Sequence, residues 1–308
     1  MRRLILVPQY PTPMRYQEWY FNEFPKQLSK EFKVIVIGKD YPFKQTITSP
    51  EMFSPISQAI DFENYQIKEY MNLALHSDDI LLLNDISFPG LFSNVLYHKK
   101  PKHCYTICHA TSKNAYDYFE PLRESKWEVE SGYSKLFNKV FVATQYHKEF
   151  LGWNNTVVTS LPLHEYQRYN ETKINDIVSV SRPTIQKVDP YLEDYIERYF
   201  DTKIVRNSFN DWEQYYKFLS KSKCLFISSS AETFGYQVLD AVYNNSLVIA
   251  PRNFSYPELL PDEYLYSDKN EAIYKINKVL CGELKKPYIK CQEQIDKFYE
   301  TIIIEMLE

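Results

Sequence analysis

The sequence is poor in several features that mark common protein classes. Its five cysteines are scattered along 308 residues, which fits reduced thiols rather than a disulfide framework. No apolar run approaches the roughly 18 residues that a membrane-spanning helix needs. The formal net charge is −4, so the composition gives no support to a nucleic-acid partner, whose binding normally shows a basic surface. We therefore expect a cytoplasmic protein without a transmembrane segment.

A secretion signal and a common metal motif are also lacking. The N-terminal stretch MRRLILVPQY holds two arginines and a short apolar run, but no small-residue cleavage site follows it. We interpret it as a first β-strand. No Asp-x-Asp sequence, which often holds a metal beside a diphosphate, occurs in the chain.

Short apolar runs alternate with helical patterns along the whole chain. The length is that of two domains of average size, and the 44% hydrophobic content is ample for packed cores. The order strand, loop, helix, strand is the opening of a doubly wound α/β sheet. We expect strands at residues 3–8, 33–38, 79–84, 103–108, 139–143, 176–180, 203–206, 224–227 and 247–250. Helices are expected over 116–134 and 289–307, among others.

The most informative stretch runs from residue 223 to residue 260. A buried strand is followed by the polar turn SSSA, a helix from about Gly235 to Asn244, and a second strand. Glu232 stands at the mouth of this helix. Asp240 lies about 200° round the helix from Val238, so we expect it to face away from the packing stripe. The free N–H groups and the positive dipole end of a helix N-terminus suit a phosphate.

This stretch resembles the donor-nucleotide half of retaining GT-B glycosyltransferases. The pattern is S-x-x-E-x-F-G-x-x-x-L-[E/D]-A, then a short strand and P-E-L-L. The resemblance implies that Glu232 contacts the donor sugar and that Asp240, where Glu is usual, holds the ribose. It also implies that the backbone of Thr233, Phe234, Gly235 and Tyr236 caps the diphosphate.

The same resemblance implies the domain plan. Two Rossmann-like doubly wound domains would face a central cleft, with an acceptor-binding domain at 1–160 and a nucleotide-sugar domain at 161–290. The last segment, 291–308, would form a helix that crosses back to the first domain. In relatives an Arg and a Lys placed like Arg182 and Lys187 clamp the diphosphate. Fixed cations stabilise the negative charge that grows on a departing diphosphate, so we expect neither a metal nor a cofactor.

The candidates in the first domain follow its strand ends. His109 follows the strand at 103–108, and the resemblance places such a His beside the donor sugar. A metal site of His103, Cys104, Cys108 and His109 is the alternative, although zinc sites usually space paired ligands around a turn.

Acceptor contacts are predicted for three residues of this domain. In many relatives two glycines occupy the first loop, where this chain has Tyr10-Pro11-Thr12-Pro13. Tyr10 is a candidate there. Arg15, Tyr16, Glu18 and Trp19 could also line the acceptor site, with a helix start that packs its aromatic residues on the sheet as the alternative. Asp85 follows the strand at 79–84 and could contact an acceptor hydroxyl or act as a helix N-cap.

The leading functional hypothesis is a hexosyltransferase-like enzyme that uses a nucleotide sugar, with a UDP-sugar such as UDP-glucose expected. Retention of anomeric configuration is implied by the resemblance alone. The expected acceptor is a glycan or a lipid-linked sugar. An alternative acceptor is a hydroxylated base of phage DNA, suggested by the compact size and by the heavy use of Asn, Lys, Ile and Tyr, which is typical of an AT-rich coding source. The alternative functions are an inactive nucleotide-sugar-binding protein and an epimerase of the same fold. The oligomeric state stays open.

Overall fold

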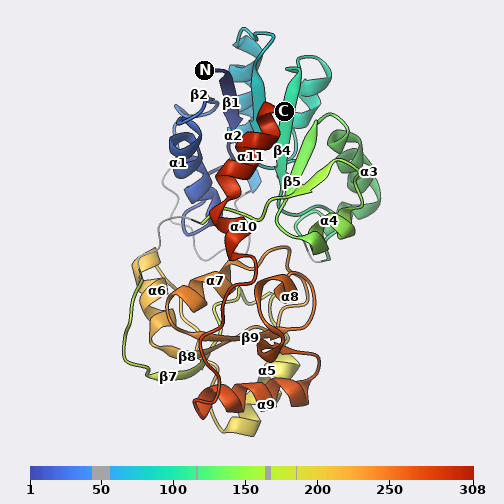
Figure 1. Ribbon diagram of the computed structural model, residues 1–308. Helices are drawn as coiled ribbons and strands as arrows, with labels where there is room; N and C mark the ends of the chain where they lie inside the picture. The colour runs from blue at the N-terminus through green and yellow to red at the C-terminus, as the bar shows by residue number, and fades with distance from the viewer. Residues whose placement is uncertain (44–55, 116, 164–167, 185) are drawn as a thin grey trace. The chain divides into compact units, whose positions relative to one another are not determined.

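The protein forms two compact units in a computed structural model that describes residues 1–43, 56–115, 117–163, 168–184 and 186–308. Unit 1 comprises Met1–His164 together with Gln294–Glu308, and unit 2 comprises Glu165–Glu293. Each unit is built on its own parallel sheet with helices around it (Figure 1). Within the described residues, no helix has the length and apolar character needed to cross a membrane.

The sheet of unit 1 has six parallel strands in the order β2-β1-β3-β4-β5-β6. A parallel sheet covered on both faces needs strands that are apolar throughout, which is why the short apolar runs of the sequence become its strands. Strand β6 is only three residues long and was not predicted from the sequence. The strands are β1 (Arg3–Val7), β2 (Lys33–Val36), β3 (Ile80–Leu83), β4 (His103–Cys108), β5 (Lys139–Val142) and β6 (Thr156–Val158).

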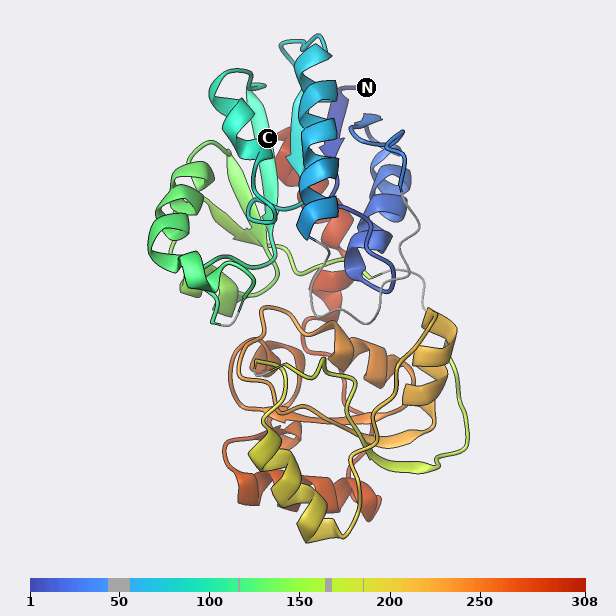
Figure 2. The same cartoon turned by 180° about the vertical axis from the view of Figure 1, so that it is seen from behind.

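Helices cover both faces of this sheet. Helix α11 lies beside α1 on one face, and α2 lies on the other face, as the two opposite views show (Figures 1 and 2). The helices of unit 1 are α1 (Tyr16–Leu28), α2 (Ile56–Asn72), α3 (Arg123–Ser134), α4 (Gln145–Leu151) and α11 (Phe298–Leu307), with short 3-10 turns η1 (Phe92–Tyr97) and η2 (Glu120–Leu122). Helix α10 (Gln292–Asp296) spans the boundary between the units in the sequence.

Two helical expectations need correction. The helix expected over 116–134 starts only at Arg123, after the separate turn η2, and Tyr116 lies outside the described residues. The single helix expected over 289–307 is two helices, because Lys297 has a non-helical backbone (φ −91°, ψ 6°).

Helix α11 is anchored to unit 1 at both ends. The ring of Phe298 lies 5.8 Å from the ring of Phe24 on α1. Near the C-terminus, Lys139 of β5 forms ion pairs with Glu305 and Glu308. These contacts combine burial of an apolar face with charge pairing, so the last segment of the chain belongs to the packing of unit 1.

The sheet of unit 2 has four parallel strands in the order β10-β9-β8-β7. The strand expected over 203–206 is wrong, since only Val205 pairs there, in an isolated bridge with Val178. The strands are β7 (Asn175–Val178), β8 (Ser222–Phe226), β9 (Leu247–Pro251) and β10 (Leu265–Tyr266), and the helices are α5 (Pro190–Phe200), α6 (Trp212–Ser220), α7 (Tyr236–Tyr243), α8 (Tyr256–Leu259), α9 (Lys269–Leu280) and the 3-10 turn η3 (Asp262–Tyr264).

Local sequence signals fix where these helices begin. Asp189, Asp211 and Asp268 cap α5, α6 and α9 with side-chain oxygens that accept backbone N–H groups of the first turn. Gly235 precedes α7 and has a backbone φ of +103°, a conformation that residues with a side chain rarely adopt. A Cβ atom there would also lie 3.1 Å from Cδ1 of Leu259. Glycine therefore sets the entry of α7, where the candidate site is found.

Candidate active site

The candidate site of unit 2 is built around an ion pair between two predicted residues. Lys187 precedes α5 in the chain, and Glu232 lies in the turn between β8 and α7. The Nζ of Lys187 lies 2.9 Å from Oε2 of Glu232 and donates a second hydrogen bond to the carbonyl oxygen of Ala231, also at 2.9 Å. The structure thus brings together two residues that are 45 positions apart.

The second carboxylate oxygen of Glu232 accepts hydrogen bonds from backbone N–H groups that precede α7. Oε1 accepts from the N–H of Thr233 at 3.0 Å and from the N–H of Phe234 at 3.3 Å. Burial by itself would raise the pKa of Glu232, but the charge and hydrogen bond of Lys187 and the two N–H groups hold this pKa below its ordinary value. A cation and two backbone donors therefore converge on one negative group. A phosphate oxygen would use the same kind of donors.

Asp240 does not face outward as the helical pattern predicted. Only 3% of this residue is exposed, and its Oδ2 accepts a hydrogen bond from the Tyr215 hydroxyl at 2.9 Å. Helix α6, which carries Tyr215, packs against α7 on this side. The helical wheel gave the angle between Asp240 and Val238 correctly but could not show that a second helix covers the polar face.

The other predicted donor residues lie around the same helix mouth. Arg182 is half-buried in the loop that follows β7, and its carbonyl oxygen accepts from the N–H of Thr184 at 2.7 Å. Phe234 is buried, and Tyr236 is the first residue of α7.

A second ion pair near this edge was missed from the sequence. Arg206 pairs with Glu193 of α5 and donates to the carbonyl oxygen of Ser181 at 3.3 Å. Glu193 also accepts from the Ser228 hydroxyl at 2.8 Å, just beyond β8. The available signal was the position of Ser181 and Ser228 after neighbouring parallel strands, because such strand ends meet at one edge of the sheet.

In unit 1, His109 follows β4 directly, as expected, and is buried. Its Nε2–H donates to the carbonyl oxygen of Asn84 at 2.9 Å, and its ring lies 4.8 Å from the ring of Tyr16 and 5.4 Å from that of Tyr20. Burial lowers the pKa of His109 to about 4, although the bond to Asn84 acts in the opposite direction. His109 is therefore a neutral hydrogen-bond donor at physiological pH.

The structure does not group the four candidate metal ligands of the segment at 103–109. Within the described residues, no three His, Cys, Asp or Glu side chains are grouped so that they could hold a metal ion. Cys104 and Cys108 are buried, and burial raises the pKa of both thiols, which disfavours the thiolate form that a metal would need.

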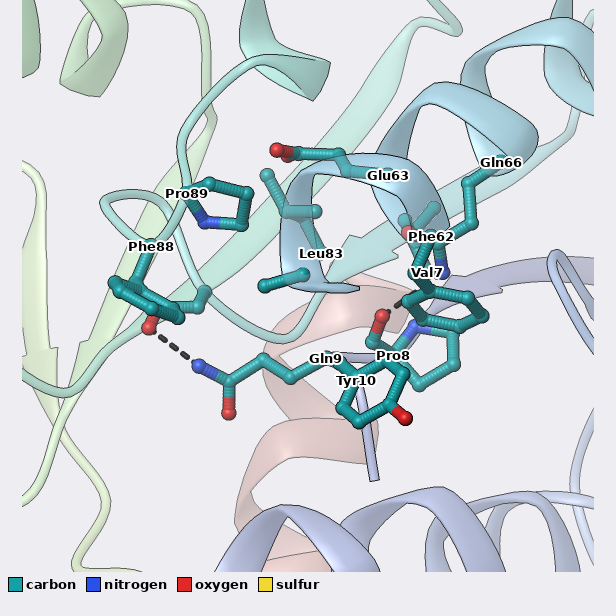
Figure 3. A pocket seen from close by; sticks show the side chains of 12 residues that line it. Val7, Pro8, Gln9, Tyr10, Phe62, Glu63, Gln66, Leu83, Phe88 and Pro89 are labelled. Atoms are coloured by element: carbon teal, nitrogen blue, oxygen red, sulfur yellow. Dashed lines mark hydrogen bonds between the residues drawn. The ribbon is translucent and has the colours of Figure 1, made fainter. Parts of the chain in front are cut away.

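Asp85 is among the residues that line a small hollow of unit 1. Tyr10 lies in the same lining (Figure 3). Its Oδ1 accepts from the N–H of Ser87 at 2.9 Å, and its Oδ2 accepts from the amide of Gln9. No helix begins at Asp85, since the next helical turn, η1, starts at Phe92. Arg15, the N-cap of α1, is not among the residues that line this hollow.

The sequence and the fold can be compared with those of known proteins. No protein-family model matches the sequence. Sucrose-phosphate synthase from Thermosynechococcus elongatus superimposes with a TM-score of 0.69, at 13% identity over 99% of this chain and 97% of that one. TarM of S. aureus, solved with UDP, gives a TM-score of 0.55 at 15% identity over 79% of this chain and 56% of that one. Both are GT-B glycosyltransferases with two Rossmann-like domains.

The chain has the GT-B fold. The GT-B likeness carries no residue roles by itself, because the sequence identities are low. A curated relative, the tRNA-queuosine alpha-mannosyltransferase of Drosophila melanogaster, is 24% identical over 149 residues, which is 48% of this chain. The matched part spans 38% of that protein's length.

Proposed function

We propose that this protein is a glycosyltransferase that moves a sugar from a nucleotide-sugar donor to an acceptor hydroxyl. The observation that carries the proposal is the convergence of the Lys187 ammonium and the N–H groups of Thr233 and Phe234 on one anionic position before α7. Such a set of donors is suited to the diphosphate of a nucleotide sugar. The GT-B fold supports the same activity.

The proposed roles in unit 2 follow the chemistry of each group. Lys187 and Arg182 stabilise the negative charge that develops on the leaving diphosphate. Glu232 exchanges its present contacts for hydroxyls of the donor sugar. Asp240 holds the ribose; because it is buried beneath α6, this role requires that it keeps its hydrogen bond to Tyr215 and offers the ribose its remaining acceptor capacity.

In the proposed reaction, the bond between the anomeric carbon and the leaving phosphate oxygen breaks. A new bond forms from that carbon to the acceptor oxygen on the same face of the sugar, so the configuration is retained. The acceptor proton passes to the leaving phosphate oxygen, and no dedicated protein base is required. His109 is proposed to contact the donor sugar through its neutral imidazole. The donor is proposed to be a UDP-sugar, which the UDP complex of TarM supports.

Two acceptor classes remain candidates. A glycan or a lipid-linked sugar is the first. The second is a hydroxylated nucleoside within a nucleic acid, and it is favoured by one specific observation, the partial likeness to an enzyme named for mannosyl transfer to queuosine in tRNA. Both would present an uncharged hydroxyl to the donor.

The test is to incubate the full chain with UDP-, GDP-, ADP- and dTDP-sugars and to measure released nucleoside diphosphate by chromatography. We expect release from one class of donor, a loss in Lys187→Ala, and no loss in Lys203→Ala, a lysine that pairs with Glu197 at the surface. Binding of a nucleotide sugar without release of nucleoside diphosphate, whichever acceptor is added, would favour the inactive binding protein. An isomerised nucleotide sugar without release would favour the epimerase.

A further inference from the structure

Three tyrosines form a row on the outer side of helix α5 in unit 2. Tyr191, Tyr195 and Tyr199 are spaced four residues apart, and they are 87%, 37% and 62% exposed. Residues four positions apart lie on the same side of a helix, about 6 Å from each other along its axis. We call this row of three rings the tyrosine track.

The packing of the fold does not account for these rings. The opposite side of α5 supplies the core contacts, through the fully buried Ile196. Exposed aromatic side chains that are scattered singly are common on protein surfaces, whereas a contiguous group indicates a binding surface. Within the described residues of unit 2, four of the six exposed large apolar side chains lie on α5 and on its neighbour α9 (Figure 1); the six are Ile174, Tyr191, Tyr195, Tyr199, Tyr274 and Tyr288.

The charges around the track are balanced. Arg198 pairs with Asp194 on α5 at 2.5 Å. The Nζ of Lys269 lies over the ring of Tyr195, 4.4 Å from its centroid, and the neighbouring Asp268 carries the opposite charge. Nucleic acids and anionic membranes are bound by surfaces with an excess of Lys and Arg, which the track lacks. Charge complementarity therefore favours a neutral partner.

The composition of the track also disfavours a protein partner. Charged residues are depleted from the core of a protein interface, yet Asp194 and Arg198 lie among the three rings on the same side of α5. The large exposed apolar side chains of this helix are all tyrosines. A tyrosine combines a flat apolar face with a hydroxyl at its edge, so the track suits a ligand that both stacks and hydrogen-bonds.

A sugar ring has this double character. Its C–H groups form an apolar face that packs on an aromatic ring, while its hydroxyls point to the sides. The spacing of the tyrosines along α5 is comparable with the length of one sugar unit in a glycan chain. Asp189 fixes the start of the helix by accepting from the N–H groups of Tyr191 and Leu192, both at 3.0 Å. The rings thus stand on a rigid element, and tyrosine has few rotatable bonds to immobilise on binding.

The track begins close to the candidate active site in the sequence. Tyr191 follows Lys187 by four residues. In a strand-helix-strand unit with parallel strands, the helix starts at the carboxyl edge of the sheet and returns towards its amino edge. The track therefore leads along unit 2 away from the position of Lys187.

We propose that the tyrosine track binds a neutral glycan chain, with its sugars stacked on Tyr191, Tyr195 and Tyr199. The proposal rests on the proposed function, because the glycan would be the acceptor or the product of the transferase. It adds a carbohydrate site outside the reacting centre and assigns to that site a polymer of several sugars.

The experiment measures glycan affinity of the full chain by ligand-observed NMR. The probes are malto-oligosaccharides and cello-oligosaccharides of two, four and six units. In at least one series we expect the tetrasaccharide to bind at least ten times more tightly than the disaccharide, and the hexasaccharide to gain little more, because three rings hold only a few sugars. The triple variant Tyr191→Ala, Tyr195→Ala, Tyr199→Ala should lose at least tenfold in affinity. Tyr288→Ala, at a tyrosine that is 69% exposed, is the matched control and should bind like the wild type.

A single substitution separates stacking from a general loss of structure. Tyr191→Phe keeps the ring and should lose less affinity than Tyr191→Ala. If the triple variant does not fold, this pair, at the most exposed position of the track, decides the matter together with the length series on the wild type.

The proposal is overturned if no oligosaccharide of either series binds, or if the triple variant binds like the wild type. Tighter binding of a uridine hexanucleotide than of every hexasaccharide would overturn it in favour of a polyanion. A dimer that is lost in the triple variant, with glycan affinity unchanged, would identify the track as an interface between two copies of the chain. Calorimetry with UDP on the same samples reports separately on the proposed function: UDP binding without glycan binding refutes the track alone, and glycan binding without any nucleotide binding refutes the donor site alone.

Discussion

Both units have polar residues near the carboxyl ends of their strands, but the pKa values of their acidic side chains are shifted in opposite directions. In unit 2, the half-buried carboxylate of Glu232 meets Lys187, and its pKa is held below the ordinary value. In unit 1, Asp85 meets an amide and a backbone N–H, and burial raises its pKa. Whether a buried acid keeps its charge thus depends on whether a cation is built beside it.

This contrast suits two different ligands. A charged edge with a cation and backbone N–H donors favours a diphosphate, whose negative charge must be matched. An edge where burial disfavours the charge of the acids, and to which the uncharged imidazole of His109 also belongs, favours a ligand that hydrogen-bonds without charge. The following changes are chosen to remove or strengthen that difference.

The largest effect is expected from removing the cation of unit 2. Lys187→Ala should lower turnover by about 10- to 1000-fold, because the leaving diphosphate loses charge stabilisation. Turnover is measured as release of nucleoside diphosphate. A full-rate variant with unchanged thermal stability would show that Lys187 plays no part in the chemistry.

The next effect concerns the buried acid Glu63 of unit 1. Its pKa is about 7 in the folded chain and near 4.5 in the unfolded chain, so its contribution to stability is fully present below about pH 4.5 and is lost as the pH rises through 7. Between pH 5 and 8 this loss is about 2 to 3 kcal/mol. Urea unfolding of Glu63→Gln should therefore show a weaker fall in stability over this range than the wild type. Glu31→Gln, at an exposed position, should follow the wild type.

An effect of opposite sign is expected from His147, which is fully buried with neither ring nitrogen paired within the described residues. Burial, and then the proximity of His109, lowers its pKa to about 3. Stability from this group is complete above about pH 6.5 and is lost as the pH falls towards 3. His147→Leu should gain about 2 kcal/mol relative to the wild type between pH 8 and pH 5. If the exposed His98→Leu gives the same gain, burial is not the cause.

The smallest effect is expected at the hydrogen bond beneath α7. Tyr215→Phe removes the hydroxyl that donates to Asp240 and should lower the free energy of unfolding by about 1 to 2 kcal/mol. Tyr199→Phe, at a residue that is 62% exposed, is the matched control and should change stability little. Equal losses in the two variants would mean that Tyr215 does not support Asp240.

The sequence predicted the apolar strands of both sheets and the helix α7 that follows the motif. It failed where pairing is short or set by distant parts of the chain. Strand β6 has three residues and β10 has two, too few for a periodic signal, and the apolar 203–206 segment pairs only at Val205. Whether such a short segment forms a strand depends on the backbone hydrogen bonds that the neighbouring strand can make with it.

The candidate site was predicted residue by residue but not as a set of contacts. The motif contains Glu232, and the resemblance implied a role for Lys187, yet nothing in their spacing showed that they pair in this structure. Asp240 was misplaced because a helical pattern does not reveal that α6 covers it. The hydrogen bond from Gln9 to Asp85 gave no signal at all, since the two residues are 76 positions apart.

The most direct test of the account is the affinity of UDP, measured by calorimetry at one ionic strength for the wild type, Lys187→Ala and Glu232→Gln. The carboxylate of Glu232 now occupies the donors that we assign to the diphosphate. The account therefore predicts binding weakened at least tenfold in Lys187→Ala, and binding equal to or tighter than the wild type in Glu232→Gln. Unchanged affinity in Lys187→Ala would contradict it.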